Sequence, residues 1–335
     1  MKAAVFKEEG VLEIADRPRP EPSEPMDVLV RVAACGICGT DLHILAVPQN
    51  HPCTPGTTMG HEFIGDVAGI GAEVDTVAVG DRVAVRPILT CGSCQECLLG
   101  RPNHCLDMTA LGIHLDGGLA ELAVVPASAC IPISTDIPAE IAALTEPLAC
   151  VYNASRKARL VPGDDVVIFG GGAIGLLFLA MCKEAGAADV VVVEPLRMRA
   201  DVAGRMGAAT VDPSDGNVVA SVAALMPAGP QVVVDAVGTQ LGNAVAVAGT
   251  AARVILFGQS EHADTVVHQV DITKKELTII GSYVGQEVFP AAVELLASGR
   301  LDLSPIISHT GSLDDLEDLI TASREGKVVK AVILP

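Results

Sequence analysis

Two patterns of hydrophobic and polar residues divide the chain near residue 150. Beyond about residue 160, short continuous apolar runs alternate with longer helix-like stretches. We interpret the apolar runs as strands at 165–170, 189–194, 231–238, 253–258 and 277–282. Stretches between them, for example 173–186 and 197–207, have a helical pattern. Continuous apolar strands separated by helices predict an α/β fold, with a doubly wound parallel sheet that is covered on both faces.

The first 150 residues instead predict an irregular β-rich domain. They are dense in Gly, Pro and Cys, and their short β-like runs lie at 28–34, 81–85 and 119–126. After residue 290 there are two helical segments and a last apolar strand, which we expect to return to the first domain. The pattern therefore predicts domains at 1–150 and 151–289, with 290–335 completing the first.

Composition and charge narrow the classes of function. The chain has 335 residues, with 41 acidic and 22 basic, for a net charge of −19. This charge argues against a nucleic-acid partner or an anionic membrane surface. We find no uncharged apolar run of about 18 residues and no secretory signal, so we expect no membrane span and a cytoplasmic protein. Ten cysteines in such a protein indicate metal or catalytic use rather than disulfides.

A glycine motif follows the first strand of the second domain. Gly170, Gly172 and Gly175 have the G-x-G-x-x-G spacing between a strand and a helix, and Glu194 ends the next strand. The glycines allow a tight turn, close approach of a pyrophosphate and close helix packing. A glycine-rich turn without a ligand is the alternative, but the complete strand–turn–helix–strand context favours a dinucleotide site.

Glu194 indicates NAD rather than NADP, because its carboxylate can bind ribose hydroxyls and would repel a 2′-phosphate. Arg197 and Arg199 leave NADP open, since either could reach a phosphate; Arg199 could instead flank the adenine. Besides the glycines and Glu194, the residues predicted to contact the cofactor are Ala173, Ile174, Arg199, Val237 and Gly258.

Four cysteines lie close together in a lobe at about 88–108. Their spacing is C-x2-C-x2-C-x7-C, at Cys91, Cys94, Cys97 and Cys105. This predicts a closed, structural zinc site with four thiolates. An iron–sulfur cluster is the competing interpretation, which the last spacing and the neighbouring domain disfavour.

A second metal site is indicated by "CGICGTDLH" at 35–43 and "GHEF" at 60–63. A catalytic zinc needs about three protein ligands and one open position. Cys38 and His61 are the best two candidates. The third is Glu62 or Glu146, between which the sequence does not choose. Cys35 could also bind, or could be a small buried residue.

In combination these motifs resemble the zinc-containing medium-chain dehydrogenases, which include alcohol, polyol, butanediol and threonine dehydrogenases. "CGICGTDLH", "GHEF", "GDRV", the four-cysteine lobe, "DGGLAEL", "EPLA", "GGGAIG" and "ELTIIGS" occur in the family's order over essentially the whole chain. The resemblance implies a GroES-like β-barrel catalytic domain, built from both chain ends, and a Rossmann NAD-binding domain.

The resemblance also implies roles for individual residues. Cys38 and His61 match zinc ligands, and Glu62 matches the ligand of the polyol branch. Glu146 lies where other branches have a third ligand and where the polyol branch has a glutamate that holds the zinc-bound water. Asp41 matches the carboxylate that orients a zinc-bound imidazole. Thr40 matches the hydroxyl that takes the substrate proton, and His43 the relay end that passes it to solvent.

The function expected from this resemblance is zinc- and NAD-dependent oxidation of a secondary hydroxyl on a small neutral polyol, cyclitol or vicinal diol. Two zinc ions per chain and a homodimer or homotetramer are expected with it. A simple secondary alcohol or threonine is the alternative substrate, because "LDLSPIISH" also resembles threonine dehydrogenases. An inactive nucleotide-binding redox sensor is the alternative from another class.

Overall fold

In the computed structural model, which describes residues 1–260 and 263–335, the chain forms two units. The first consists of Met1–Ala149, Gln286–Gly299 and Ile307–Pro335, and the second of Cys150–Gly285 and Arg300–Ile306. The sequence pattern predicts that residues 290–335 return to the first domain as one piece. In the structure, Arg300–Ile306 instead packs with the second unit, where the short 3₁₀ helix η5 (Ser304–Ile306) contacts α5 (Ala173–Glu184) and α6 (Arg197–Arg205).

The second unit is built on six parallel strands in the order β12-β11-β10-β13-β14-β15. Their bounds are β10 Val166–Phe169, β11 Val190–Val193, β12 Ala209–Val211, β13 Val232–Asp235, β14 Arg253–Leu256 and β15 Thr278–Gly281. The predicted parallel sheet is therefore confirmed. The sequence pattern missed β12, because this strand has only three residues and two of them are exposed.

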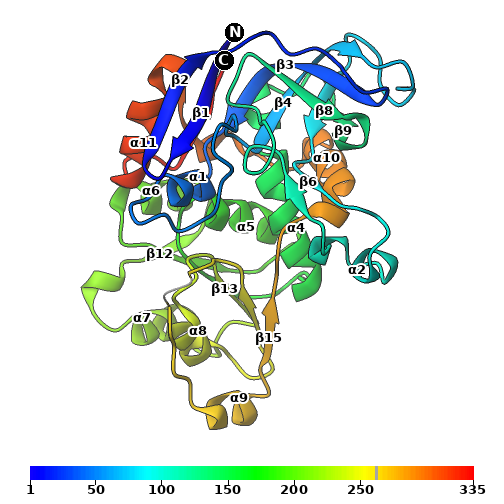
Figure 1. Ribbon diagram of the computed structural model, residues 1–335. Coiled ribbons are helices and arrows are strands. Elements are labelled where there is room, and N and C mark those ends of the chain that lie inside the picture. The colour runs from blue at the N-terminus through cyan, green and yellow to red at the C-terminus, as the bar shows by residue number, and fades with distance from the viewer. Residues whose placement is uncertain (261–262) are drawn as a thin grey trace. The chain divides into compact units, whose positions relative to one another are not determined.

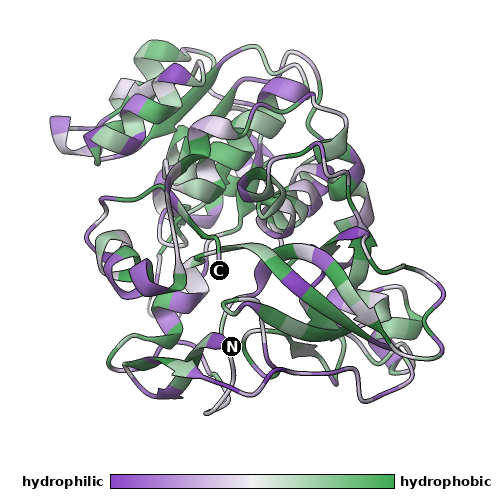
Figure 2. Ribbon diagram, turned by 90° about the horizontal axis from the view of Figure 1, so that it is seen from above, coloured by the Kyte–Doolittle hydropathy of each residue, from purple (hydrophilic) through white to green (hydrophobic). Residues whose placement is uncertain are grey.

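Helices cover this sheet. They are α5 Ala173–Glu184, α6 Arg197–Arg205, α7 Val218–Leu225, α8 Leu241–Val247 and α9 Gln269–Lys275. α5 packs on β10 and β11, whereas α8 packs on β13 and β14. The central strands are buried on both faces, which is why they are continuous runs of valine and isoleucine. Figure 2 shows the strands mostly in the hydrophobic colour and the helices in both colours.

The main sheet of the first unit has the order β16-β17-β3-β4-β5-β9, and β8 also pairs with β3. Its strands are β3 Asp27–Gly36, β4 Glu62–Ile70, β5 Arg82–Val85, β8 Leu122–Pro126, β9 Cys130–Pro132, β16 Ile307–Gly311 and β17 Lys330–Ile333. Two ribbons accompany it, β1 Lys2–Glu8 with β2 Val11–Asp16, and β6 Ile88–Leu89 with β7 Thr109–Ala110. Residues from both chain ends thus meet in one sheet.

The helices of the first unit are short. They are α1 Gly39–Ile44, α2 Gln95–Leu98, α3 Ala139–Ala142, α10 Phe289–Ala297 and α11 Leu316–Arg324, and α4 Thr145–Ala158 continues into the second unit. α11 packs on β16 and β17, and Figure 1 shows it beside the N-terminal strands. An ion pair between Lys2 Nζ and Asp314 Oδ1, 2.7 Å apart, links the first strand to the turn before α11.

A half-buried ion pair secures the start of β14 in the second unit. Arg253 Nη2 lies 2.5 Å from Asp164 Oδ1, and Arg253 Nη1 donates to the carbonyl oxygens of Ala158 and Arg159. Asp164 is buried, and its other oxygen accepts a hydrogen bond of 2.9 Å from the Val161 N–H. The pair therefore joins the end of α4, the start of β10 and the start of β14.

Asp164→Asn should lower the free energy of unfolding by roughly 2–3 kcal/mol, because it leaves the half-buried Arg253 without a counter-charge. Glu13→Gln is the control, since the Lys7–Glu13 pair is exposed on both sides and should contribute about 0–1 kcal/mol. Urea unfolding followed by circular dichroism measures both. Equal effects of the two substitutions would contradict the structural role assigned to Asp164.

Candidate active site and metal centres

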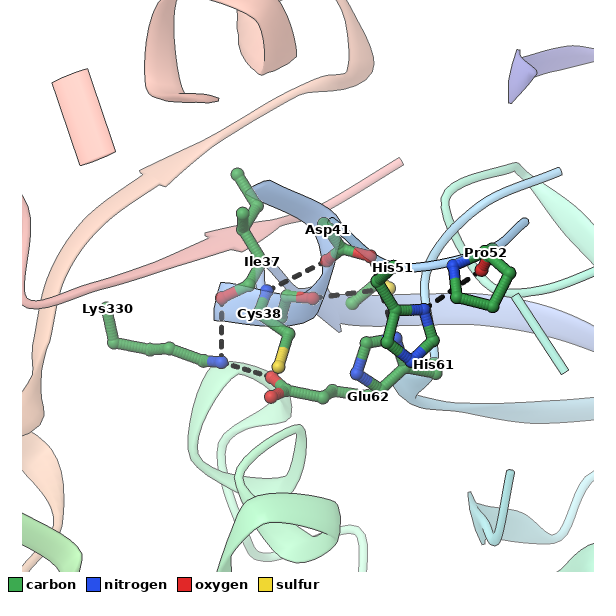
Figure 3. Close-up of polar contacts among 10 residues, drawn as sticks. Ile37, Cys38, Asp41, His51, Pro52, His61, Glu62 and Lys330 are labelled. Carbon is green, nitrogen blue, oxygen red and sulfur yellow. Dashed lines mark hydrogen bonds and ion pairs between the residues drawn. The ribbon is translucent and has the colours of Figure 1, made fainter. Parts of the chain in front are cut away.

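Cys38, His61 and Glu62 form a compact group of three metal-ligating side chains in the first unit. One potential ligand atom from each lies within 4.8 Å of the other two. The antiparallel pairing of β3 with β4 brings them together, because Gly36 at the end of β3 lies opposite Glu62 at the start of β4. His61 and Glu62 are buried, and Figure 3 shows all three side chains pointing toward one another. A thiolate, an imidazole and a carboxylate are a suitable donor set for zinc.

Asp41 lies behind the imidazole of His61. Its Oδ1 is 3.6 Å from His61 Nδ1. Within the described residues neither atom has a hydrogen-bond partner, so these two atoms can pair with each other. Its Oδ2 accepts a hydrogen bond of 2.8 Å from the Cys38 N–H, which orients the carboxylate at the start of α1. Burial works to lower the pKa of His61, but the charges of Cys38 and Asp41 outweigh it and raise that pKa well above its usual value. The site therefore favours positive charge, as a cation site requires.

Thr40 and His43 lie on α1, directly after Cys38. They are three residues apart and so share one side of the helix. Thr40 is half-buried, whereas His43 is exposed. Solvent exposure thus increases along α1 from the metal cluster to His43, which is the arrangement that a proton relay needs.

Glu146 and Glu62 do not have equivalent positions. Glu146 lies in the first turn of α4, and its charge contributes to the raised pKa of His61. Among the described residues, the group with mutually close ligand atoms contains Glu62 and not Glu146. The geometry therefore favours Glu62 as the carboxylate beside Cys38 and His61.

Lys330 is a buried residue of this site that the sequence analysis missed. It begins β17, is 4% exposed, and forms an ion pair with the Glu62 carboxylate (Figure 3). Its Nζ also donates to the Ile37 carbonyl oxygen at 2.8 Å. Burial works to lower the pKa of Lys330, but the charges of Glu62 and Cys38 outweigh it and raise that pKa. A lysine inside the apolar run "VVKAVILP" was the available signal, because an unpaired charge is rarely buried.

Two further residues near the cluster have less central positions. Cys35 is fully buried within β3, where burial raises the pKa of its thiol well above the usual value, as expected for a core residue rather than a ligand. His51 is half-buried, and its Nδ1 lies 2.9 Å from the Pro52 carbonyl oxygen (Figure 3). Burial lowers the pKa of His51, and His61 adds a smaller effect.

The four cysteines of the predicted structural zinc lobe also come together. Their sulfur atoms all lie within 4.8 Å of one another, and all ten cysteines of the chain are free thiols. The four cysteines of the lobe are Cys91, Cys94, Cys97 and Cys105. The β6–β7 ribbon closes the base of the lobe, and α2 begins just after the second cysteine.

Backbone amides point at the sulfur atoms of this lobe. The Cys94 N–H donates to Cys91 Sγ and the Cys91 N–H to Cys105 Sγ, both at 3.3 Å. Backbone N–H groups of Cys97 and Leu106 lower the pKa of the Cys94 thiol to about 6. Such amides stabilise thiolates, which are the form that binds metal. The four close sulfurs fit a closed tetrahedral site with no open position.

The predicted nucleotide turn lies at the carboxyl end of β10 in the second unit. Gly170 has a φ of +97°, and a Cβ on Gly175 would overlap the Gly170 carbonyl oxygen, so both positions require glycine. Gly172 caps α5, whose first residues are Ala173 and Ile174. The turn therefore presents the start of a twelve-residue helix, with its free N–H groups, at the edge of the sheet.

The other residues predicted to contact a cofactor gather around this turn. A Cβ built on Gly170 would lie 2.8 Å from Val237, and one built on Gly258 would overlap the backbone of Val237 and Gly238. Neighbouring parallel strands explain this, since β10, β13 and β14 end at the same edge. In an open α/β sheet this is the edge where ligands bind.

Glu194 is fixed by the backbone of the turn. It is 4% exposed, and its carboxylate accepts hydrogen bonds from the Gly171 N–H at 2.6 Å and the Leu196 N–H at 2.9 Å. Arg199 approaches the turn, with Nη1 at 3.8 Å from the place of a Cβ on Gly172. Arg197 is exposed and lies 3.4 Å from Asp201. The two arginines that the sequence left as alternatives thus differ: Arg199 reaches the turn and Arg197 is paired in solvent.

Comparisons with known proteins agree with this arrangement. Residues 24–135 match the alcohol dehydrogenase GroES-like domain, and residues 173–298 match the zinc-binding dehydrogenase family. An L-threonine 3-dehydrogenase from Shewanella frigidimarina is 33% identical, over 97% of this chain and 96% of its own. A probable D-xylulose reductase A from Neosartorya fischeri is 32% identical, over 98% and 95%.

Two solved structures share the whole fold. One is a putative zinc-binding dehydrogenase from Sinorhizobium meliloti bound to NADP, with a TM-score of 0.95, 35% identity and coverage of 100% of this chain and 99% of that one. The other is the alcohol dehydrogenase RspB from E. coli CFT073 complexed with NADH, with a TM-score of 0.91, 31% identity and coverage of 100% and 99%.

The chain therefore belongs to the zinc-dependent medium-chain dehydrogenases, which are oxidoreductases of the alcohol and polyol dehydrogenase type. The fold predicted from the sequence resemblance, a GroES-like domain together with a Rossmann domain, is confirmed. Within residues 1–260 and 263–335, no helix has the length and apolar character needed to cross a membrane.

Substitutions should separate the two metal centres. Cys97→Ser should remove one zinc per chain and lower stability by several kcal/mol, because the metal supplies much of the lobe's folding free energy. Cys38→Ser should remove the other zinc and nearly all activity while the fold persists. Metal analysis and urea unfolding measure both effects.

Cys130→Ser is the matched control, since Cys130 is a buried thiol outside both clusters and its replacement should leave both zinc ions in place. Retention of the wild-type metal content by Cys97→Ser would exclude the lobe as a zinc site.

Proposed function

We propose that this protein oxidises a secondary hydroxyl of a neutral polyol, cyclitol or vicinal diol to a ketone, with NAD as the hydride acceptor. The observation that carries the proposal is the close group of Cys38, His61 and Glu62, followed on α1 by Thr40 and His43. The chain also has a glycine turn suited to a dinucleotide. These features support a working enzyme rather than an inactive nucleotide-binding sensor.

Cys38, His61 and Glu62 would hold the catalytic zinc, and Cys91, Cys94, Cys97 and Cys105 the structural zinc. When bound, the catalytic zinc would supply Lewis-acid polarisation of the substrate hydroxyl, and the nicotinamide a hydride acceptor. The chain's own residues do the rest. Asp41 holds the imidazole of His61 in place, as carboxylates next to metal-bound histidines commonly do.

The proton of the substrate hydroxyl leaves through α1. Thr40 accepts it on its hydroxyl and passes it toward His43, whose exposed ring transfers it to solvent. The hydride would leave the carbon that bears this hydroxyl, so one alcohol and one NAD⁺ give one ketone, one NADH and one proton. Glu146 in this scheme contributes negative charge on the side of His61 and orients water or substrate rather than replacing Glu62.

The proposed substrate class follows from the carboxylates at the site, because carboxylates suit neutral ligands with several hydroxyl groups. Glu62 and Glu146 can accept hydrogen bonds from additional substrate hydroxyls. The D-xylulose reductase relative, whose name denotes a polyhydroxylated ketone, supports this class. The threonine dehydrogenase relative supports the alternative, an amino-alcohol acid. The net charge of −19 favours neutral substrates over anionic ones.

NAD is proposed over NADP because the fixed carboxylate of Glu194 lies where a 2′-phosphate would be repelled. Of the two similar structures, one contains NADH and one NADP, so this preference depends on the residues of this chain. Ten free cysteines agree with the reducing cytoplasm as its compartment. A homodimer or homotetramer is proposed because β15 is an edge strand whose Ile279 is exposed.

A substrate panel tests the reaction. Xylitol, sorbitol, arabinitol, inositols, 2,3-butanediol, 2-propanol and threonine are offered at equal concentration with NAD, and NADH absorbance is followed. We expect the highest catalytic efficiency for a polyol, cyclitol or vicinal diol. If 2-propanol or threonine exceeds all of these by about tenfold, the substrate class is wrong while the dehydrogenase class stands. Cys38→Ser protein is the control for metal-independent background.

The cofactor preference depends on the charge of Glu194. Wild-type protein should have a higher catalytic efficiency with NAD than with NADP. Glu194→Gln keeps an oxygen for the Gly171 N–H but removes the charge, and should narrow the preference by about tenfold, or ~1.4 kcal/mol. Asp271→Asn, which removes an exposed charge on α9, should leave the ratio unchanged. A wild-type preference for NADP would show that Arg199 decides the site instead.

A further inference from the structure

Lys330 is buried at the metal cluster although it is a lysine from the end of the chain. It is 4% exposed on β17 and makes two contacts through Nζ, with the Glu62 carboxylate and with the Ile37 carbonyl oxygen at 2.8 Å. Figure 3 shows its side chain extended toward Glu62 from the side opposite His61. The ammonium and the metal cluster thus share one carboxylate.

The backbone around this pair leaves space for it. Gly36 lies opposite Glu62 on β4 and opposite Val332 on β17. A Cβ on Gly36 would overlap Glu62 Oε2 and lie 3.0 Å from Lys330 Cε. The absence of a side chain at residue 36 therefore allows the carboxylate and the lysine to meet.

Sharing Glu62 has an electrostatic consequence. Asp41 and Glu62 are the buried carboxylates of the cluster, and Cys38 adds a half-buried thiol. The Lys330 side chain pairs with one of these groups, Glu62. A carboxylate that is bonded to an ammonium donates less charge to a metal, and the ammonium repels the cation. With Cys38, His61 and Glu62 as its three protein ligands, a catalytic zinc has one further position for substrate, and a weakly held third ligand lets the coordination adjust when substrate enters.

We propose that Lys330 is a positioning residue that competes with the catalytic zinc for the Glu62 carboxylate. Glu62 is thereby kept as a weak, exchangeable ligand, and the metal keeps a position for the substrate hydroxyl. This inference rests on the proposed function, because it takes Cys38, His61 and Glu62 as the catalytic zinc site.

Zinc affinity tests the competition directly. Competition with a chelator gives the zinc dissociation constant of the catalytic site in wild-type protein, Lys330→Met and Lys330→Arg. Lys330→Met removes the charge at similar side-chain length, so zinc should bind about tenfold more tightly while turnover falls about tenfold. Lys330→Arg keeps a cation and should stay close to wild type in both measurements.

Lys327→Met is the matched control, because Lys327 precedes the same strand but is exposed and paired with Glu325. It should change neither zinc affinity nor turnover. If Lys330→Met does not fold, Lys330→Gln replaces it. The amide can still donate to Glu62 without a charge, so zinc binding should again tighten, by less than tenfold.

A double substitution shows whether the effect passes through Glu62. In a Glu62→Gln background most of the effect of Lys330→Met on zinc affinity should disappear. Cobalt-substituted protein provides a spectroscopic check, since Lys330→Met should change the d–d absorption bands and Glu62→Gln should abolish that change. A merely structural lysine would alter stability without these two results.

Wild-type or weaker zinc binding by folded Lys330→Met, or an equal effect in the Glu62→Gln background, would overturn the inference. The proposed function would still stand if Cys38→Ser loses zinc and activity. If Cys38→Ser keeps both, the proposed zinc site itself fails.

Discussion

The candidate active site depends on the pairing of three strand segments around Gly36. β3 ends there, β4 begins directly opposite with Glu62, and β17 pairs with the same residues from the other end of the chain. Neighbouring strands are about 4.8 Å apart, so this pairing brings residues from three distant parts of the sequence into one cluster. Cys38 follows the end of β3 after a single residue, and it therefore cannot move away from Glu62 without breaking the sheet.

Charge is the second constraint on the first unit. A buried cluster with several acidic groups is costly unless cations or hydrogen bonds compensate them. Asp41 accepts a hydrogen bond from the Cys38 N–H, and Glu62 is paired with Lys330. The remaining negative charge raises the pKa of His61, which indicates that the site has room for further positive charge. A zinc ion would supply this positive charge.

The second unit uses backbone geometry in place of a charged cluster. Gly170 takes a conformation that other residues rarely adopt, and Gly175 has no space for a side chain. Glu194 fills the space beside the turn and is held there by two backbone amides. Backbone contacts of the turn thus fix the position of Glu194, and the proposed preference for NAD over NADP depends on the side chains of Glu194 and Arg199.

The sequence by itself determined those features that are local. The glycine turn, the four-cysteine lobe and the "CGICGTDLH" segment each place their chemistry within a few residues, and the alternation of apolar runs with helices predicts the parallel sheet. Tertiary structure decided what depends on residues far apart. Glu62 and Glu146 are equally plausible ligands in the sequence, and only strand pairing places Glu62 beside Cys38 and His61. Lys330 could not be assigned, because its partner lies 268 residues away and an apolar strand gives no sign of which buried charge it will meet.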